Sequence, residues 1–338
     1  MPDRLRWGIL GTGNIAGQFA QALAGSHRGR LAAVGSRRAD SARQFAADNG
    51  AEAAHGAYDA LLADPNVEAV YNALPNALHH AWTLQALAGG KHVLCEKPFA
   101  TNAAQSEEMF DAARTAGRVL VEAFMYRSHP LTAAVVQALR AGSIGQLHLI
   151  RTSFCYATRK VDGNVRFSTE LAGGALMDIG AYCVSFARLA AGAEPTNVHA
   201  TAHMHASGVD VMAAGTLQFP GNVLASFTCG MNAHADNSAF LCGSEGYIQV
   251  PVPWKPPVQG AAYTIARMAP PRQDNPRSDA GPTRETFHVD AEHPLYALEA
   301  DDFAATVQDG AAPAVSRDDT LGNMRVLDEL RRQVGLGF

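Results

Sequence analysis

The sequence predicts an α/β protein with a doubly wound parallel sheet at its N-terminus and an α+β domain after it. Apolar strands alternate with helical segments up to about residue 123, as a parallel sheet requires. Beyond Phe124, segments of alternating polarity follow one another between Gly, Pro and Asn turns, which predicts a large, mostly antiparallel open sheet. We therefore divide the chain into residues 1–123 and 124–338.

A glycine-rich turn opens the first domain. Residues 5–10 predict a buried strand, and apolar residues at helical spacing predict a helix over 15–23. Between them, Gly11 permits a tight turn, Gly13 lets a pyrophosphate approach the backbone, and Ala16 allows close helix–strand packing. Free N–H groups at the helix start favour the phosphates, so the pattern predicts a Rossmann dinucleotide site. The expected contacts are Gly11, Thr12, Gly13, Asn14 and Ile15.

The second strand, residues 31–36, predicts which dinucleotide binds. An NAD-selective site places an acidic residue here for the ribose 2′-hydroxyl, but this chain has Ser36, Arg37 and Arg38. A hydroxyl and two guanidinium groups suit a 2′-phosphate, so we expect NADP(H) to be preferred over NAD(H). The alternative is a solvated charged turn.

Three further strands, over 67–74, 91–95 and 118–123, complete the predicted parallel sheet. Ligands of such sheets bind beyond the carboxyl ends of the strands. The residues expected there are Leu74, Pro75, Asn76, Glu96, Lys97, Pro98 and Glu122. The helices expected between the strands cover 41–49, 57–62, 77–88 and 103–116.

The second domain starts with a predicted helix over 129–141. Strands are expected over 148–156, 198–205, 211–219, 222–231, 238–242 and 246–250, with one helix after Gly173-Gly174. The Pro-rich stretch 251–282 is expected to be loop or sheet edge. Helices over 294–309 and 318–334 are expected to close the chain.

Bulk properties exclude several classes of function. A net charge of −5 argues against nucleic-acid binding, and no apolar window is long enough to cross a membrane. Five scattered cysteines and no leader pattern predict reduced thiols in a cytoplasmic protein. His199, His203 and His205 are expected to share one face of a strand. Since no carboxylate or cysteine completes a site there, we predict no metal and assign them to a wet dimer contact.

Two constellations carry the chemistry. Lys97 lies at a strand end that faces the cofactor cleft, while Asp178 and Tyr182 are four apart on a glycine-opened helix. Oxidising a carbinol requires a group that takes the hydroxyl proton. Lowering a tyrosine pKa from about 10 to 7 costs about 4 kcal/mol. One ammonium about 4 Å away supplies about that much at an effective dielectric near 20. We therefore expect Lys97 to activate Tyr182 while Asp178 aligns the substrate; the alternative is a structural Asp–Tyr pair beside an exposed lysine.

Taken together and in this order, the glycine turn, Glu96-Lys97-Pro98 and Gly-Gly-x-x-x-Asp178-x-Gly180-x-Tyr182 resemble the glucose–fructose oxidoreductase/inositol dehydrogenase family. With Tyr at position 182, where many members carry His, the chain resembles the branch of dimeric dihydrodiol and NADP-dependent D-xylose dehydrogenases. The resemblance implies a Rossmann domain plus a second domain whose open sheet forms a homodimer or a dimer of dimers. It also implies NAD(P) contacts that include His79, and a proline at 98 that is often cis.

Substrate contacts are expected from the loop before the glycine-opened helix, since it would overhang the nicotinamide. From this region they are Phe154, Arg166, Phe167 and Asp178, and the catalytic Lys97 and Tyr182 complete the expected set. The activity implied is hydride transfer between NADP(H) and a sugar or cyclic polyol hydroxyl, first of all aldopyranose oxidation to a lactone. Oxidation of a trans-dihydrodiol and reduction of a sugar ketone are alternatives.

Two rival interpretations remain. Tyr156 and Lys160 match the Tyr-x-x-x-Lys pair of short-chain dehydrogenases, but Tyr156 ends a strand-like run. On a strand the two residues would lie more than about 10 Å apart, at about 3.3 Å per residue. A non-catalytic NADP-binding sensor or scaffold would need none of Lys97, Asp178 and Tyr182.

Overall fold

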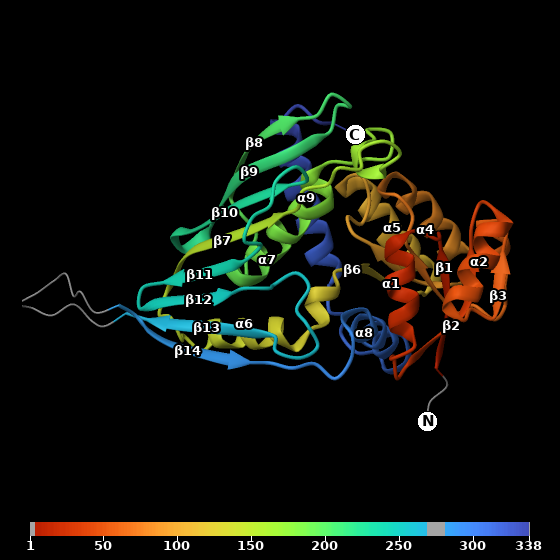
Figure 1. The fold of residues 1–338 in the computed structure, drawn as a ribbon, viewed down its shortest axis with the longest axis horizontal. Coiled ribbons are helices and arrows are strands. Elements are labelled where there is room, and N and C mark those ends of the chain that lie inside the picture. The colour runs from red at the N-terminus through yellow and green to blue at the C-terminus, as the bar shows by residue number, and fades with distance from the viewer. Residues whose placement is uncertain (1–3, 269–280, 338) are drawn as a thin grey trace, which may run out of the picture.

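The structure, a computed structural model, describes residues 4–268 and 281–337. Its strands form two sheets (Figure 1). The first has the order β3-β2-β1-β4-β5-β6, and the second has the order β14-β13-β12-β11-β7-β10-β9-β8. This confirms the predicted fold class, while the division at residue 123 stays a prediction.

Every strand pair of the first sheet is parallel, as buried apolar strands joined by helices require. The order reverses between β1 and β4, and ligands of open α/β sheets bind at such a reversal. The elements are β1 (Leu5–Leu10), α1 (Asn14–Leu23), β2 (Gly29–Gly35), α2 (Ala39–Asn49), β3 (Ala53–His55), α3 (Tyr58–Leu62), β4 (Ala69–Asn72), η1 (Asn76–Leu78), α4 (His79–Ala88), β5 (His92–Glu96), α5 (Ala103–Ala116) and β6 (Leu120–Ala123). The three-residue β3 was not predicted, because it is too short to show a period.

Neighbouring strands of the second sheet are antiparallel except for β7 and β10, which pair in parallel. Its elements are β7 (Leu147–Cys155), β8 (Asn197–Met204), β9 (Asp210–Phe219), β10 (Val223–Gly230), β11 (Ala239–Gly243), β12 (Gly246–Val250), β13 (Ala262–Arg267) and β14 (Thr283–His288). The helical elements of this half are η2 (Met125–Ser128), α6 (Pro130–Arg140), η3 (Val165–Phe167), η4 (Leu176–Gly180), α7 (Ala181–Ala191), η5 (Pro220–Asn222), α8 (Leu295–Asp309) and α9 (Arg317–Gln333).

Two expectations about this half are wrong. The stretch 251–282 contains β13, which pairs on both sides; surrounding prolines hid its alternation from the sequence. Residues 269–280 of that stretch lie outside the described residues. His205 lies beyond the end of β8 and packs its ring against Phe167, so it does not share the strand face of His199 and His203.

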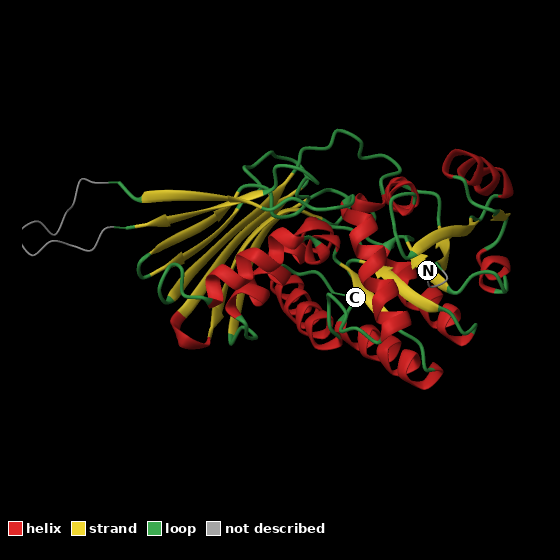
Figure 2. Cartoon of the chain, turned by 90° about the horizontal axis from the view of Figure 1, so that it is seen from below, coloured by secondary structure: helices red, strands yellow, loops and turns green. Residues whose placement is uncertain are grey.

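Helices gather on one face of the large sheet (Figure 2). Helices α7 and α9 pack against β7 and β8, which leaves the other face uncovered. Helix α8 then returns to the first half of the chain and packs against α1 (Figure 1). A helix that follows the second sheet in the chain therefore packs on the first half of the molecule.

Candidate active site

One cavity of about 920 Å³ joins the carboxyl edge of the first sheet to the large sheet and its helices. This is within the usual range for cofactor and small-molecule sites. Most of the predicted site residues line it. They are Gly11, Thr12, Gly13, Asn14, Ile15, Ser36, Arg37, Arg38, Leu74, Pro75, Asn76, Glu96, Lys97, Phe154, Arg166, Asp178 and Tyr182.

The glycine turn fits a pyrophosphate. Gly11 has a φ of +98°, which other residues rarely adopt, and a Cβ added at Gly13 would meet no atom within 4 Å. Helix α1 carries no acidic residue in its first turn and no side chain caps its N-terminus. Its N–H groups therefore remain open to an anion at the positive end of the helix dipole.

The carboxyl end of β2 presents positive charge to the same cavity. Ser36 is buried, whereas Arg37 and Arg38 are exposed, and no acidic side chain from this turn lines the cavity. Arg38 Nε donates to Ser41 Oγ over 3.0 Å, so its guanidinium is held along the start of α2. These groups bring hydrogen-bond donors and positive charge to the dinucleotide end of the cavity.

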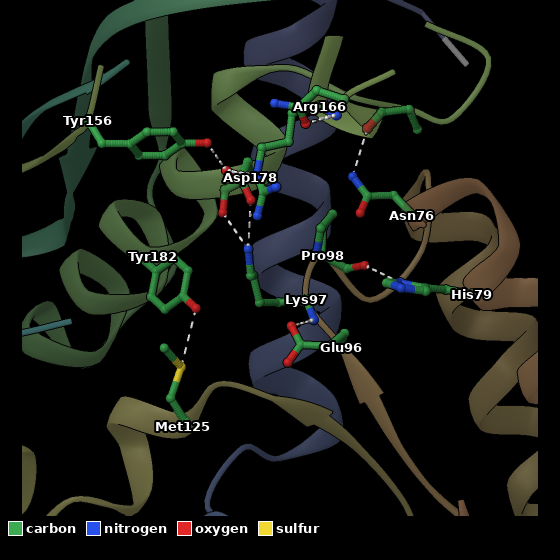
Figure 3. Close-up of polar contacts among 12 residues, drawn as sticks. Asn76, His79, Glu96, Lys97, Pro98, Met125, Tyr156, Arg166, Asp178 and Tyr182 are labelled. Carbon is green, nitrogen blue, oxygen red and sulfur yellow. Dashed lines mark hydrogen bonds and ion pairs between the residues drawn. The ribbon is translucent and has the colours of Figure 1, made fainter. Parts of the chain in front are cut away.

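Beyond the glycine turn and β2, the part of the cavity that adjoins the large sheet is organised around Asp178 (Figure 3). Lys97 Nζ donates to its carbonyl oxygen at 2.7 Å and to Oδ1 at 3.1 Å. Arg166 Nε and the Tyr156 hydroxyl both donate to Oδ2, each over 2.7 Å. Burial disfavours the Asp178 carboxylate, but Lys97 and Arg166 outweigh it and hold its pKa below the usual range. Asp178 is thus ionised and fixes three neighbouring side chains.

Asp178 lies in a π-helical turn, η4, directly before α7. Such turns are often found at functional sites because they redirect side chains within a helix. The turn and α7 bring Asp178 and Tyr182 to the same cavity, as their spacing predicts.

Tyr182 does not have the expected electrostatic environment. Lys97 Nζ lies 5.1 Å from the centre of its ring, while its hydroxyl donates to Met125 Sδ over 3.3 Å (Figure 3). Burial, followed by the Glu96 carboxylate, raises the pKa of Tyr182 well above its usual value. The expected lowering of the Tyr182 pKa by Lys97 is therefore wrong for this structure, because burial and the Glu96 carboxylate dominate and the ammonium is paired with Asp178.

Four predicted site residues do not line the cavity. Pro98 follows a cis peptide bond with Lys97, and the His79 ring lies 2.8 Å from the Pro98 carbonyl and 2.7 Å from that of Leu74. Burial lowers the pKa of His79 to about 4, so the neutral ring donates to one of these carbonyls and supports the loops from behind. Glu122 and Phe167 are buried elsewhere, with Glu122 accepting a bond from the Phe99 amide over 3.1 Å.

Sequence reasoning missed several residues of the cavity. Tyr156 was considered only as half of a rival motif, yet it binds Asp178. Lys255 also lines the cavity, and its rarity as one of four lysines was the available signal. Tyr296 arrives from α8, far along the chain, and no local pattern marks it. Other unpredicted lining residues include Gln18, Ser41, Tyr58, Leu171 and Ile179.

The chain matches two family models. Residues 5–124 match the oxidoreductase family with an NAD-binding Rossmann fold, and residues 132–249 match the GFO/IDH/MocA C-terminal domain. It is 37% identical over 255 residues to trans-1,2-dihydrobenzene-1,2-diol dehydrogenase of Mus musculus, covering 75% of this chain and 76% of that protein. It is 32% identical over 335 residues to D-xylose 1-dehydrogenase (NADP(+)) 2 of Haloferax volcanii, covering 98% of each.

Solved structures agree over the whole chain. A 3-ketoreductase from Actinomadura kijaniata, in complex with NADP and TDP-benzene, is 33% identical with a TM-score of 0.88, covering 98% of both chains. An aldose-aldose oxidoreductase from Caulobacter crescentus is 26% identical with a TM-score of 0.85 over 98% of both chains. Within the described ranges, no helix has the length and apolar character to span a bilayer.

Proposed function

This chain belongs to the GFO/IDH/MocA family of oxidoreductases, and from that premise we propose that it transfers a hydride between NADP(H) and a hydroxyl of a sugar or cyclic polyol. The first substrate class is an aldopyranose, oxidised at its anomeric carbon to a lactone. The observation that carries the proposal is the single cavity in which the glycine turn and Lys97, Asp178 and Tyr182 meet. The xylose dehydrogenase relative, which spans nearly the whole chain, supports the choice of a sugar.

Preference for NADP(H) over NAD(H) rests on Ser36, Arg37 and Arg38. The Haloferax volcanii xylose dehydrogenase, whose name includes NADP(+), and the 3-ketoreductase structure, which contains NADP, support this preference. When bound, the nicotinamide supplies or accepts the hydride. The remaining chemistry belongs to side chains of this chain.

We assign each catalytic side chain one task. Lys97 donates to the substrate oxygen and stabilises negative charge as it develops there. Asp178 holds Lys97 and Arg166 in place through its two carboxylate oxygens. Tyr182 transfers the proton of the reacting hydroxyl. Phe154 stacks on Trp254 and meets the Tyr182 ring edge-on at 5.3 Å, so it forms an apolar wall for the sugar ring.

A second candidate, reduction of a sugar ketone, is favoured by the raised pKa of Tyr182. A neutral phenol is ready to donate a proton to a carbonyl oxygen as hydride arrives. The 3-ketoreductase neighbour has the same fold over its whole length. Oxidation of a trans-dihydrodiol, the activity in the name of the mouse relative, is a further alternative.

We also propose that the uncovered face of the large sheet forms a homodimer or a dimer of dimers. Leu224 on β10 is half exposed and alternates with the buried Val223 and Ala225, so it lies on this face; Met204 at the end of β8 is also half exposed. Burying them against a second copy would remove apolar surface from water. Light scattering at micromolar concentration would detect the dimer, and a monomer would contradict it. A cytoplasmic location stays a prediction.

A substrate panel tests the function. Aldoses, inositols, cyclic diols and keto sugars would be assayed by the absorbance of NADPH or NADH, with each cofactor in parallel. We expect turnover of at least one aldopyranose or keto sugar, faster with the phosphorylated cofactor. Turnover confined to cyclic diols would favour the dihydrodiol alternative, and turnover of none would contradict the proposal.

A further inference from the structure

A line of polar side chains on α8 leads away from Tyr182 into the protein. Tyr296, Glu299 and Asp302 are spaced three residues apart, so they follow one face of the helix. From Tyr296 to Asp302 this face extends about 9 Å at about 1.5 Å per residue. Tyr296 lines the large cavity, whereas Asp302 is exposed to solvent. Tyr296 therefore marks the cavity end of this helix face, and Asp302 marks its solvent end.

A small cavity continues the line beyond Glu299. Its volume is about 10 Å³, close to that needed for one water molecule. Polar residues supply hydrogen-bonding groups around it. They are Glu122, Ser128, Glu299, Asp302 and Thr306. Ser128, in η2, also hydrogen-bonds to Asp302, and η2 packs against α8.

The interior groups of this line have unused hydrogen-bonding capacity. Tyr296 Oη and both oxygens of Glu299 are buried and have no protein partner among the described residues. Glu299 is 5% exposed and Tyr296 is 8% exposed. Native proteins rarely leave such groups without a partner, and the small cavity lies where it can supply one to Glu299.

The mechanism leaves a task for these groups. A neutral Tyr182 hydroxyl can take the substrate proton only if it passes its own proton to another group. Bound dinucleotide and substrate would fill the cavity from which that proton could otherwise escape. A route through protein groups on α8 would avoid the filled cavity.

We propose that Glu299 carries the reaction proton between Tyr182 and the protein surface, with Tyr296 and Glu96 on the inner side and Asp302 on the outer side. This rests on the proposed function. In oxidation, the substrate O–H bond breaks as a Tyr182 O–H bond forms, and the former Tyr182 proton moves outward. Glu299 accepts a proton on one oxygen and releases its own from the other. Asp302 and then solvent take the proton that Glu299 releases, and the nicotinamide takes the hydride, so charge and atoms balance. In the reduction, protons move in the opposite direction, from solvent to Tyr182.

The electrostatic surroundings suit a neutral, two-way carrier. Burial, then Glu96 and Asp302, raise the pKa of Glu299 well above its usual value. Tyr71 and Tyr296 also face this group, from β4 and α8, and Tyr71 donates to Glu96. A protonated carboxyl has both a donor and an acceptor, which a relay requires.

The test compares Glu299→Gln with the wild type in a stopped-flow instrument. A pH-indicator dye reports proton release, and absorbance reports NADPH formation in the same mixing experiment. We expect both signals to coincide in the wild type. In the variant, proton release should lag behind the first hydride transfer, and steady-state kcat should fall between about 10- and 100-fold. Asp309→Asn, on the exposed end of the same helix, is the matched control and should leave the signals coincident.

Three outcomes would overturn the relay. One is proton release in step with NADPH in a folded Glu299→Gln protein. Another comes from infrared spectra, which need no turnover. The relay requires a protonated-carboxyl band in the wild type that disappears in Glu299→Gln, and identical spectra for the two proteins would contradict it. If Glu299→Gln fails to fold, Asp302→Asn on the surface must show a smaller lag, and coincident signals there would contradict the route. A wild type that oxidises and reduces nothing would contradict the proposed function, while the infrared band would still report on Glu299.

Discussion

The two halves of the large cavity are built in different ways. The dinucleotide half consists of short continuous segments, the glycine turn and residues 36–38, each placed by a single strand end. The substrate half is assembled from side chains that follow β5 and β7 and from η3, and these side chains converge on Asp178 in η4. The first half combines open N–H groups with the side chains of Ser36, Arg37 and Arg38. The second half is a network of charged and polar side chains, in which each group affects the position and the protonation of its neighbours.

This difference predicts that substitutions in the substrate half affect turnover, and substitutions in the dinucleotide half affect cofactor affinity. The largest effect is expected for Lys97→Met. Without its ammonium, charge developing on the substrate oxygen loses its donor, and kcat should fall about 100- to 1,000-fold. NADPH binding, followed by fluorescence, should persist. Lys160→Met is the control, since Lys160 is exposed and lies off the cavity. Full activity of a Lys97→Met protein that binds NADPH would remove the catalytic assignment.

An intermediate effect is expected for Arg37→Asp in the dinucleotide half. Replacing a guanidinium by a carboxylate removes a charge-assisted bond to the 2′-phosphate, worth about 1.5–3 kcal/mol. KM for NADP should therefore rise by about 10- to 100-fold, with little change for NAD or in kcat. Arg43→Asp on α2 serves as the control because Arg43 pairs with Asp40 away from the cavity. Equal losses with both cofactors would show that Arg37 does not read the phosphate.

The smallest effect is expected for Tyr156→Phe. Arg166 still donates to the same Asp178 oxygen and Lys97 to the other, so only part of the ~1.5–3 kcal/mol of one hydrogen bond to a charged group should appear in the rate. Steady-state kcat/KM for the sugar should fall by about 3- to 10-fold, and KM for NADP should stay constant. Tyr247→Phe, on β12, controls for loss of a hydroxyl elsewhere. A changed affinity for NADP would contradict the separation of the two halves.

Sequence patterns were most informative where structure depends on neighbours along the chain. The parallel sheet, the helix start after Gly13 and the positions of Ser36 and Arg37 follow from strand periods and glycine geometry, which are local properties. Helix α5 and strand β12 have the predicted bounds for the same reason. The motifs also named Lys97, Asp178 and Tyr182, and the fold brings them to one cavity.

Tertiary structure alone decided the state of those groups. The distance between Lys97 and Asp178, and the arrival of Glu96 beside Tyr182, depend on segments more than 80 residues apart. Electrostatic energy depends on such distances and on burial, which no spacing rule contains. For the same reason only the fold reveals Tyr296 and Glu299, because α8 reaches the first sheet's ligand edge after the chain has completed the second sheet.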